Sequence, residues 1–253
     1  METKYQDWQK SFGLSEIDEE TPSYFLQSLA EANIIGLITD GEAEDLLLKH
    51  YIEKGFDESY KTDLAILRIK RYLTVQDFNL SKEYFYTIHR YIFNGLIKDA
   101  GQTRTVNLSK KEPFINNESV IYAPMQHIEE YLAYDFKEEQ KKCYYSMSYE
   151  AIINSLVPFI INIWQAHPFN DGNTRTVSVF LEKYLNSMGI PTNNDVFKNN
   201  STYFRNALVR ANYITGTRIE PTDEYVRKFM TKLLIDPKIE LDINELNLSY
   251  TRD

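Results

Sequence analysis

The stretch PFIINIWQAHPFNDGNTR, residues 158–175, combines the end of one helix, a polar loop and the start of a second helix. The apolar residues from Phe159 to Trp164 predict a helix that is buried in a core. Pro168 ends this helix, because proline disfavours helical geometry in the residue before it. A second helix is expected from about Asn173 to the stop at Gly189. Two buried helices should therefore hold the loop between them rigidly.

Most of the remaining chain also predicts helices, because apolar residues recur three and four positions apart. The exception is residues 101–122, where β-prone pieces at 104–108 and 119–122 flank a mostly polar segment, 110–117. This pattern favours a small hairpin or flap. The expected helices span about 22–34, 41–54, 62–73, 81–96, 148–166, 173–188, 201–213 and 222–234, with another from 125. We predict an all-α fold with one β-hairpin.

The chain length of 253 residues allows one large domain with a helical extension. The expected division is a helical extension over 1–60, a core over 61–236 and a tail over 237–253. The net charge is −9, and no block of Lys and Arg stands out, which argues against nucleic-acid binding. Lys110 and Lys111 are interpreted as solvated surface residues. The N-terminus lacks the features of a signal peptide and no apolar run is long enough to span a membrane, so a cytoplasmic protein is expected.

The loop from His167 to Arg175 carries a set of groups suited to phosphate chemistry. His167 can accept a proton near neutral pH. The N-terminus of the following helix favours an anion, and Arg175 adds a cation that matches phosphate oxygens. Asp171 fits such a site once a hard cation such as Mg²⁺ is included, because Mg²⁺ binds a carboxylate together with phosphates. The combination predicts phosphoryl or nucleotidyl transfer.

Residues 167–175 resemble the signature motif of the Fic family: His, any residue, Phe, any residue, Asp or Glu, Gly, Asn, Gly or a substitute, Arg. Every fixed position matches, with Thr174 where many members have Gly. The segment from Gly101 to Arg104, followed by Val106, is similar to the family's entry to the flap. Residues 203–213 are similar to a helix that shapes the nucleotide pocket. The resemblance implies a Fic-type helical bundle and protein adenylyltransferase activity, with ATP as co-substrate.

The resemblance also implies a role for each matching residue. His167 would deprotonate a Tyr, Thr or Ser hydroxyl on a target protein, or on the enzyme itself, for attack on the α-phosphorus of ATP. Asp171 would hold Mg²⁺, and Phe169 would anchor the loop. The residues expected to contact the nucleotide are Gly172, Asn173, Thr174, Arg175 and Asn206. The flap residues expected to bind the target in an extended form are Arg104, Val106 and Ile121.

The sequence departs from the family pattern at a position linked to autoinhibition. Many relatives carry a second arginine three positions after Arg175, where this chain has Ser178. In relatives with an N-terminal inhibitory helix, a glutamate pairs with that arginine. Residues 27–33 look like a degraded version of this helix, with Glu31 in the glutamate position. Because Ser178 offers no arginine to pair with, we expect inhibition by Glu31 to be weak or absent.

Several alternatives remain open at this stage. The same pocket could serve phosphate transfer, another nucleotide donor or removal of AMP. A catalytically quiet module held by a separate partner is a further alternative, and relatives often form homo-oligomers. His50, His89 and His127 are scattered without metal-ligand spacing and are interpreted as surface or helix-end residues without a role.

Overall fold

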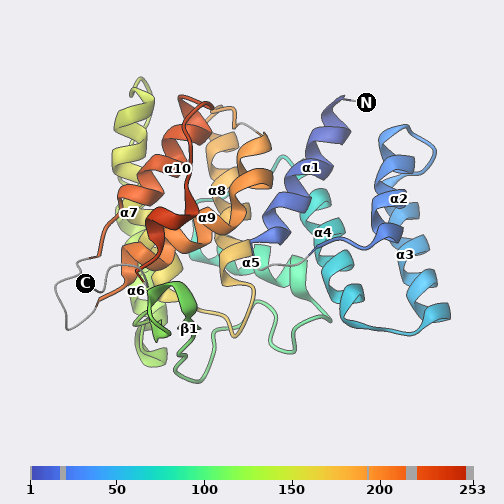
Figure 1. Ribbon diagram of the computed structural model, residues 1–253, viewed down its shortest axis with the longest axis horizontal. Helices are drawn as coiled ribbons and strands as arrows, with labels where there is room; N and C mark the ends of the chain where they lie inside the picture. The colour runs from blue at the N-terminus through green and yellow to red at the C-terminus, as the bar shows by residue number, and fades with distance from the viewer. Residues whose placement is uncertain (1, 18–20, 193, 215–220, 249–253) are drawn as a thin grey trace.

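The computed structural model describes residues 2–17, 21–192, 194–214 and 221–248, and within them the fold is ten α-helices with one short hairpin (Figure 1). The helices are α1 (Glu2–Glu16), α2 (Tyr24–Ile34), α3 (Asp40–Lys54), α4 (Glu58–Thr74), α5 (Lys82–Phe93), α6 (Ile128–Glu139), α7 (Tyr149–Ala166), α8 (Asn173–Ser187), α9 (Asn194–Asn212) and α10 (Glu224–Leu234). The strands are β1 (Lys111–Glu112) and β2 (Glu118–Ser119). The predicted all-α fold with a small hairpin is confirmed. No described helix combines the length and the apolarity that crossing a bilayer requires.

Helix α8 forms the centre of the larger core. Every side chain from Asn173 to Leu185 is buried, and α5, α7, α4 and α1 pack against this helix. Helix α7 packs between α8 and α10 and contributes an almost continuous apolar sequence. The hydroxyl of Ser148 caps its N-terminus by accepting the N–H of Ala151. The predicted helices at 148–166 and 173–188 thus form, and they hold the loop between them from both sides.

Helix α1 was not predicted from the sequence. Its residues are mostly polar, and only a narrow stripe, including Trp8 and Leu14, is buried. Gly13 lies where α1 crosses α9, so close that a Cβ atom there would overlap the backbone of Lys198. The helix is therefore stabilised by this close crossing with α9 and not by a strong local pattern.

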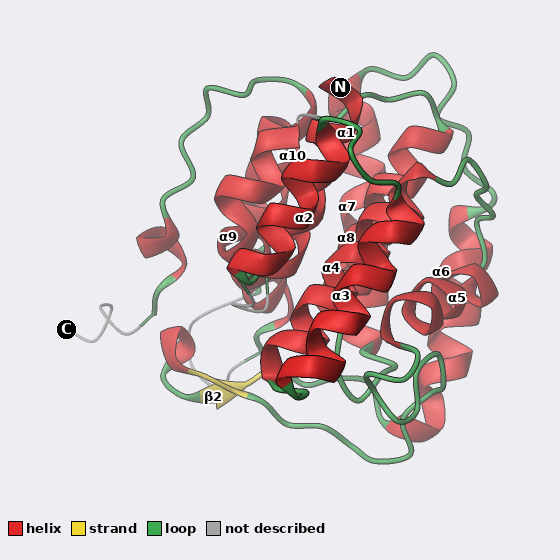
Figure 2. Ribbon diagram, turned by 90° about the vertical axis from the view of Figure 1, so that its right-hand side faces the viewer, coloured by secondary structure: helices red, strands yellow, loops and turns green. Residues whose placement is uncertain are grey.

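Two hydrophobic clusters divide the molecule. The larger one contains α5 to α10, one face of α4, Leu14 of α1 and Ile17 just after it. The smaller one joins α2 and α3 to the start of α1 and one face of α4, around Trp8 and Tyr51. Figures 1 and 2 show α2 and α3 side by side at one end of the molecule. Helix α1 thus contributes to both clusters, and the division of the chain near residue 60 stays a prediction.

The hairpin is shorter than the sequence indicated. Lys111 pairs with Ser119 and Glu112 pairs with Glu118 in an antiparallel register, and a 3₁₀ turn over Pro113–Ile115 lies between the strands. The β-prone segment 104–108 does not form a strand, so that part of the prediction was wrong. The reason is tertiary: Arg104 bonds to the loop after α7, which leaves this segment running along the loop instead of pairing with β2.

Candidate active site

The loop between α7 and α8 is closed by contacts within its own sequence. Asn173 donates from its side chain to the carbonyl of Phe169 over 2.8 Å and accepts the N–H of Phe169 over 2.9 Å. Phe169 itself is fully buried, as expected for an anchor. The Asn173 amide is used within the loop, and the Thr174 hydroxyl accepts the indole N–H of Trp164 over 3.0 Å. The backbone N–H groups of these two residues, in the first turn of α8, are therefore the groups suited to a phosphate.

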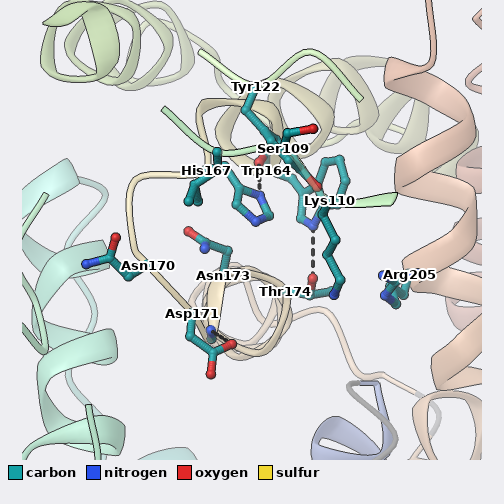
Figure 3. A pocket seen from close by; sticks show the side chains of 12 residues that line it. Ser109, Lys110, Tyr122, Trp164, His167, Asn170, Asp171, Asn173, Thr174 and Arg205 are labelled. Carbon is teal, nitrogen blue, oxygen red and sulfur yellow. Dashed lines mark hydrogen bonds between the residues drawn. The ribbon is translucent and has the colours of Figure 1, made fainter. Parts of the chain in front are cut away.

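The side chain of His167 is positioned by two neighbouring aromatic residues. Its Nδ1 lies 3.2 Å from the carbonyl oxygen of Trp164, and its ring stacks on Tyr122 with centroids 4.0 Å apart. A carbonyl oxygen only accepts, so Nδ1 carries the hydrogen and Nε2 keeps a lone pair. In Figure 3 this second nitrogen points toward the middle of the pocket. Burial, aided by the charges of Arg104 and Lys110, lowers the pKa of His167 to about 3, so the ring is neutral at physiological pH.

A pocket of about 220 Å³ opens beside His167. A larger hollow of about 620 Å³ adjoins it, and three residues, Lys110, Asp171 and Arg205, line both. The groups lining the first pocket come from the flap, the end of α7, the loop between α7 and α8, the start of α8 and α9 (Figure 3). The pocket is therefore lined by the predicted base His167, the predicted carboxylate Asp171 and two cations, Lys110 and Arg205. The sequence analysis had not assigned either cation to the site.

Asp171 extends toward the space shared by the two hollows. Its side chain is 68% exposed, and its carboxylate accepts the N–H of Gly172 over 2.7 Å. Arg175 lies 3.9 Å from the same oxygen. No group of three potential ligands of the His, Cys, Asp or Glu type occurs in the described part of the chain. One open carboxylate is nevertheless what Mg²⁺ needs when nucleotide phosphates and water supply its remaining ligands, so the residues fit the ion in that form.

Arg175 and Asn206 occupy the second hollow. The guanidinium of Arg175 is buried and lies 4.7 Å from the centre of the Phe93 ring. Asn206 accepts from the Arg205 guanidinium over 3.0 Å, and Arg205 also bonds both oxygens of Glu112 at 2.6 and 2.8 Å. The fold thus brings the predicted nucleotide-contacting residues of α8 and α9 to one place.

Of the three predicted flap residues, two face solvent and one does not. Val106 is 53% exposed and Ile121 is 62% exposed. Arg104 is only 2% exposed, and its guanidinium donates to the carbonyls of His167, Val106 and Ala123. Its side chain is therefore used to join the flap to the catalytic loop and has no face to offer a target.

Sequence reasoning missed four residues that the fold brings to this site: Lys110, Tyr122, Arg205 and His89. Lys110 was assigned to the solvated surface, but it lines both hollows. Arg205 precedes Asn206 on the helix already linked to the nucleotide, and that position was its only signal. His89 was expected at the surface, and this was wrong. It is fully buried between the flap entry and the loop, where burial lowers its pKa to about 4.

The two residues connected with autoinhibition lie outside the site. Glu31 is exposed on α2, which packs against α3 and α1, and it lines neither hollow. Ser178 is fully buried inside α8, where its hydroxyl donates to the carbonyl of Thr174 over 2.9 Å. No hydrogen bond or ion pair joins these two residues in the part of the chain that the structure describes.

Comparison with protein families gives a match between residues 79–185 and the Fic/DOC family model. Together with the all-α fold, this match shows that the chain carries a Fic domain over these residues. This family comprises AMPylating or nucleotidyl-transferring enzymes. No curated protein matches the chain.

Solved structures support the fold. The chain is similar to the N-terminal FIC domain of the Bep8 protein from Bartonella sp. 1-1C, with a TM-score of 0.58 and 15% identity over 74% of this chain and 90% of that one. It is also similar to BepC with bound AMPPNP from Bartonella tribocorum, with a TM-score of 0.55 and 16% identity over 68% and 83% of the two chains. A third match is the N-terminal Fic domain of a Bartonella effector protein from Bartonella sp. AR 15-3, with a TM-score of 0.57 and 18% identity over 71% and 84%. At these identities the likeness concerns the fold.

Proposed function

We propose that this protein transfers AMP from ATP to a Tyr, Thr or Ser hydroxyl of a target protein. The observation that carries the proposal is the orientation of His167, whose Nδ1 hydrogen is used by Trp164 and whose Nε2 points into a pocket beside Asp171. A neutral imidazole with an open lone pair is suited to general-base catalysis. The Fic domain and a similar structure with bound AMPPNP also support a nucleotide donor.

In the proposed reaction His167 acts on the proton of the target hydroxyl. Nε2 takes that proton while the hydroxyl oxygen forms a bond to the α-phosphorus of ATP, and the bond from this phosphorus to the bridging oxygen breaks as pyrophosphate leaves. The backbone N–H groups at the start of α8 and the side chain of Lys110 would bind phosphate oxygens. Asp171 would hold Mg²⁺, which supplies positive charge to the phosphates when bound.

Asn206 and Arg175 would contact the nucleotide from the second hollow, where both residues lie. The target segment would lie along the flap, where Val106 and Ile121 present exposed apolar side chains. Extended backbone pairing is a common way to hold a peptide against a strand or flap.

The test is transfer of label from α-³²P-ATP in the presence of Mg²⁺, with the protein itself and a cell lysate as acceptors. Wild type should label protein, and His167→Ala should label none while retaining its folding and ATP binding. His127→Ala is a matched control because the His127 side chain is 45% exposed, pairs with Glu130 and lines neither hollow. Labelling that survives in His167→Ala would rule out the proposed base. If label enters only from γ-³²P-ATP, GTP or UTP, the result would contradict AMP transfer and indicate a related transfer reaction in the same pocket.

A further inference from the structure

His89 connects two loops that lie close together only in the folded protein. It is on α5, and its side chain is 0% exposed. Its Nδ1 accepts the backbone N–H of Gly101 over 2.8 Å, and its Nε2 lies 3.0 Å from the carbonyl oxygen of Asp171. One imidazole thus contacts both the entry to the flap and the residue that carries the exposed carboxylate of the pocket.

These two contacts fix the tautomer of the ring. The N–H of Gly101 can only donate, so Nδ1 must carry a lone pair. The carbonyl of Asp171 can only accept, so Nε2 must carry the hydrogen. A ring with hydrogens on both nitrogens would direct one of them at the N–H of Gly101. The geometry therefore assigns the neutral Nε2–H tautomer to His89.

Among the hydrogen bonds of the described residues, the bond from His89 to the carbonyl of Asp171 is the one that joins α5 to the loop. The other contacts between them are apolar. Tyr86, His89 and Phe93 lie on one face of α5, at spacings of three and four residues. The His89 ring stacks on Phe169 with centroids 3.7 Å apart, and the ring of Phe93 fills the space against Gly172. Stacked rings hold the loop against α5 but do not define its position along the helix. The hydrogen bond to Asp171 does, because it requires a particular distance and direction.

We propose that His89 is a positioning residue of the transfer site. Its Nε2–H holds the carbonyl of Asp171 and so sets where the Asp171 carboxylate lies relative to His167, while its Nδ1 holds Gly101 at the flap entry. The effect on catalysis rests on the proposed AMP transfer. The tautomer of His89 and the position of the loop are independent of that reaction and can be measured without it.

Two substitutions separate the two contacts. In His89→Asn the amide oxygen lies near the position of Nδ1 and keeps an acceptor for Gly101, but the side chain is too short to reach Asp171. In His89→Gln the amide nitrogen lies near the position of Nε2 and keeps a donor for Asp171, but the acceptor for Gly101 is lost. His127→Gln is the matched control on the surface.

The expected result is a kcat about tenfold or more below wild type for His89→Asn, with KM for ATP little changed, because small misplacement of a catalytic group has large effects on rate. His89→Gln should stay within about threefold of wild type. If His89 served only for packing, kcat would fall alike in both variants, in proportion to their loss of folded protein. Equal losses in the two variants, or full activity in His89→Asn, would overturn the proposal.

Two measurements do not depend on AMP transfer. In ¹⁵N spectra of the wild type, one of the four histidines should show a protonated Nε2 and an unprotonated Nδ1, and its signal should vanish in His89→Gln. Amide hydrogen exchange at residues 170–172 should be faster in His89→Asn than in His89→Gln. A different tautomer or unchanged exchange would reject the positioning role. If the tautomer and the exchange rates are as expected but the wild type transfers no AMP, the proposed function is rejected. The positioning of the loop by His89 would still hold.

Discussion

At the scale of single residues, the active loop depends on backbone conformations that side chains rarely adopt. His167 has a φ of 45° and a ψ of 57°, in the left-handed region. For a residue other than glycine this conformation costs about 1–2 kcal/mol. Two hydrogen bonds offset this cost: Arg104 donates to the carbonyl of His167, and the carbonyl of Trp164 accepts the backbone N–H of His167. The reactive side chain is thus held in place by a conformation that the surrounding fold maintains.

Gly172 shows the same dependence and gives a direct test. Its φ is 73°, and a Cβ atom there would lie 2.5 Å from the ring of Phe93. Gly172→Ala should therefore cost the left-handed penalty of about 1–2 kcal/mol and a packing penalty of about 1–3 kcal/mol. Gly189→Ala is the matched control, because Gly189 has a φ of 70° with no atom near its Cβ position. Urea unfolding should show a clearly larger loss for Gly172→Ala, and equal losses would mean that Phe93 does not restrict this site.

The pKa of His167 predicts the pH profile of the transfer reaction. A base with an ordinary histidine pKa of about 6.5 would be mostly protonated at pH 5.5, and the rate would fall with it. Burial lowers the pKa of His167 to about 3 in the free protein. The neutral, active form should therefore persist as the pH falls from 8 to 5.5, and kcat/KM should show no loss from this group over that range. A tenfold drop in kcat/KM between pH 7 and pH 5.5, with folding intact, would contradict this assignment.

The sequence predicted the residues of the loop but not all the partners that position them. His167, Asp171 and Arg175 are close in sequence, so a motif identifies them together. His89 and Arg205 reach the same site from α5 and α9, and no local pattern distinguishes a buried histidine from a surface one. Arg104 was found, but the use of its side chain was not, because its three carbonyl acceptors come from segments that only the fold brings together.

At the scale of elements, the flap is a short hairpin whose position depends on α9. Two residues in each strand give too little pairing for an independent hairpin. Two carboxylates secure it instead: Glu112 pairs with Arg205, and Glu118 accepts the hydroxyl of Tyr213 over 2.6 Å. The helices were predictable from periodicity, whereas α1 and the true strand positions were not. Both depend on contacts with α9 or with the catalytic loop, and not on local propensity.

The buried pair between Glu112 and Arg205 should control how firmly the flap is held. Glu112→Gln leaves the Arg205 guanidinium largely buried without its charged partner, which we expect to cost about 3 kcal/mol. Amide exchange over residues 111–119 should rise sharply in this variant. Glu118→Gln is the control, since it changes a carboxylate on the same hairpin that is exposed, and it should cost about 1 kcal/mol. Equal exchange in the two variants would show that the ion pair does not hold the flap.

At the scale of the whole molecule, the two hydrophobic clusters separate a small N-terminal group of helices from the helices that carry the site. Helices α2 and α3 pack on α1 and on one face of α4, whereas the catalytic loop lies on α5 within the larger cluster. Helices α1 and α4 contribute to both clusters: Trp8 of α1 lies in the smaller one and Leu14 in the larger one, and α4 packs one face into each. Figure 1 shows α2 and α3 on the far side of α4 from α8. Any influence of α2 on catalysis would have to pass through α1 or α4.

This arrangement leads to a specific expectation for Glu31. The side chain is exposed on α2, and Ser178, which stands at the position of the second arginine in many relatives, is buried in α8 and bonded to Thr174. Because Glu31 has no arginine to pair with there, Glu31→Ala should leave the transfer rate within about twofold of wild type. Glu31→Gly should behave likewise in activity, although glycine inside a helix should cost about 1 kcal/mol of stability.

The two variants together distinguish inhibition from simple loosening of α2. Release of an inhibitory glutamate would raise the transfer rate strongly in both variants at unchanged ATP concentration. Loosening of the helix would affect only Glu31→Gly, and it would appear as a lower unfolding midpoint in urea. Initial rates of α-³²P label incorporation, measured beside unfolding curves, separate these cases. A strong rise in both rates would mean that α2 reaches the active site in solution, which the packing of α2 against α1 and α3 does not provide.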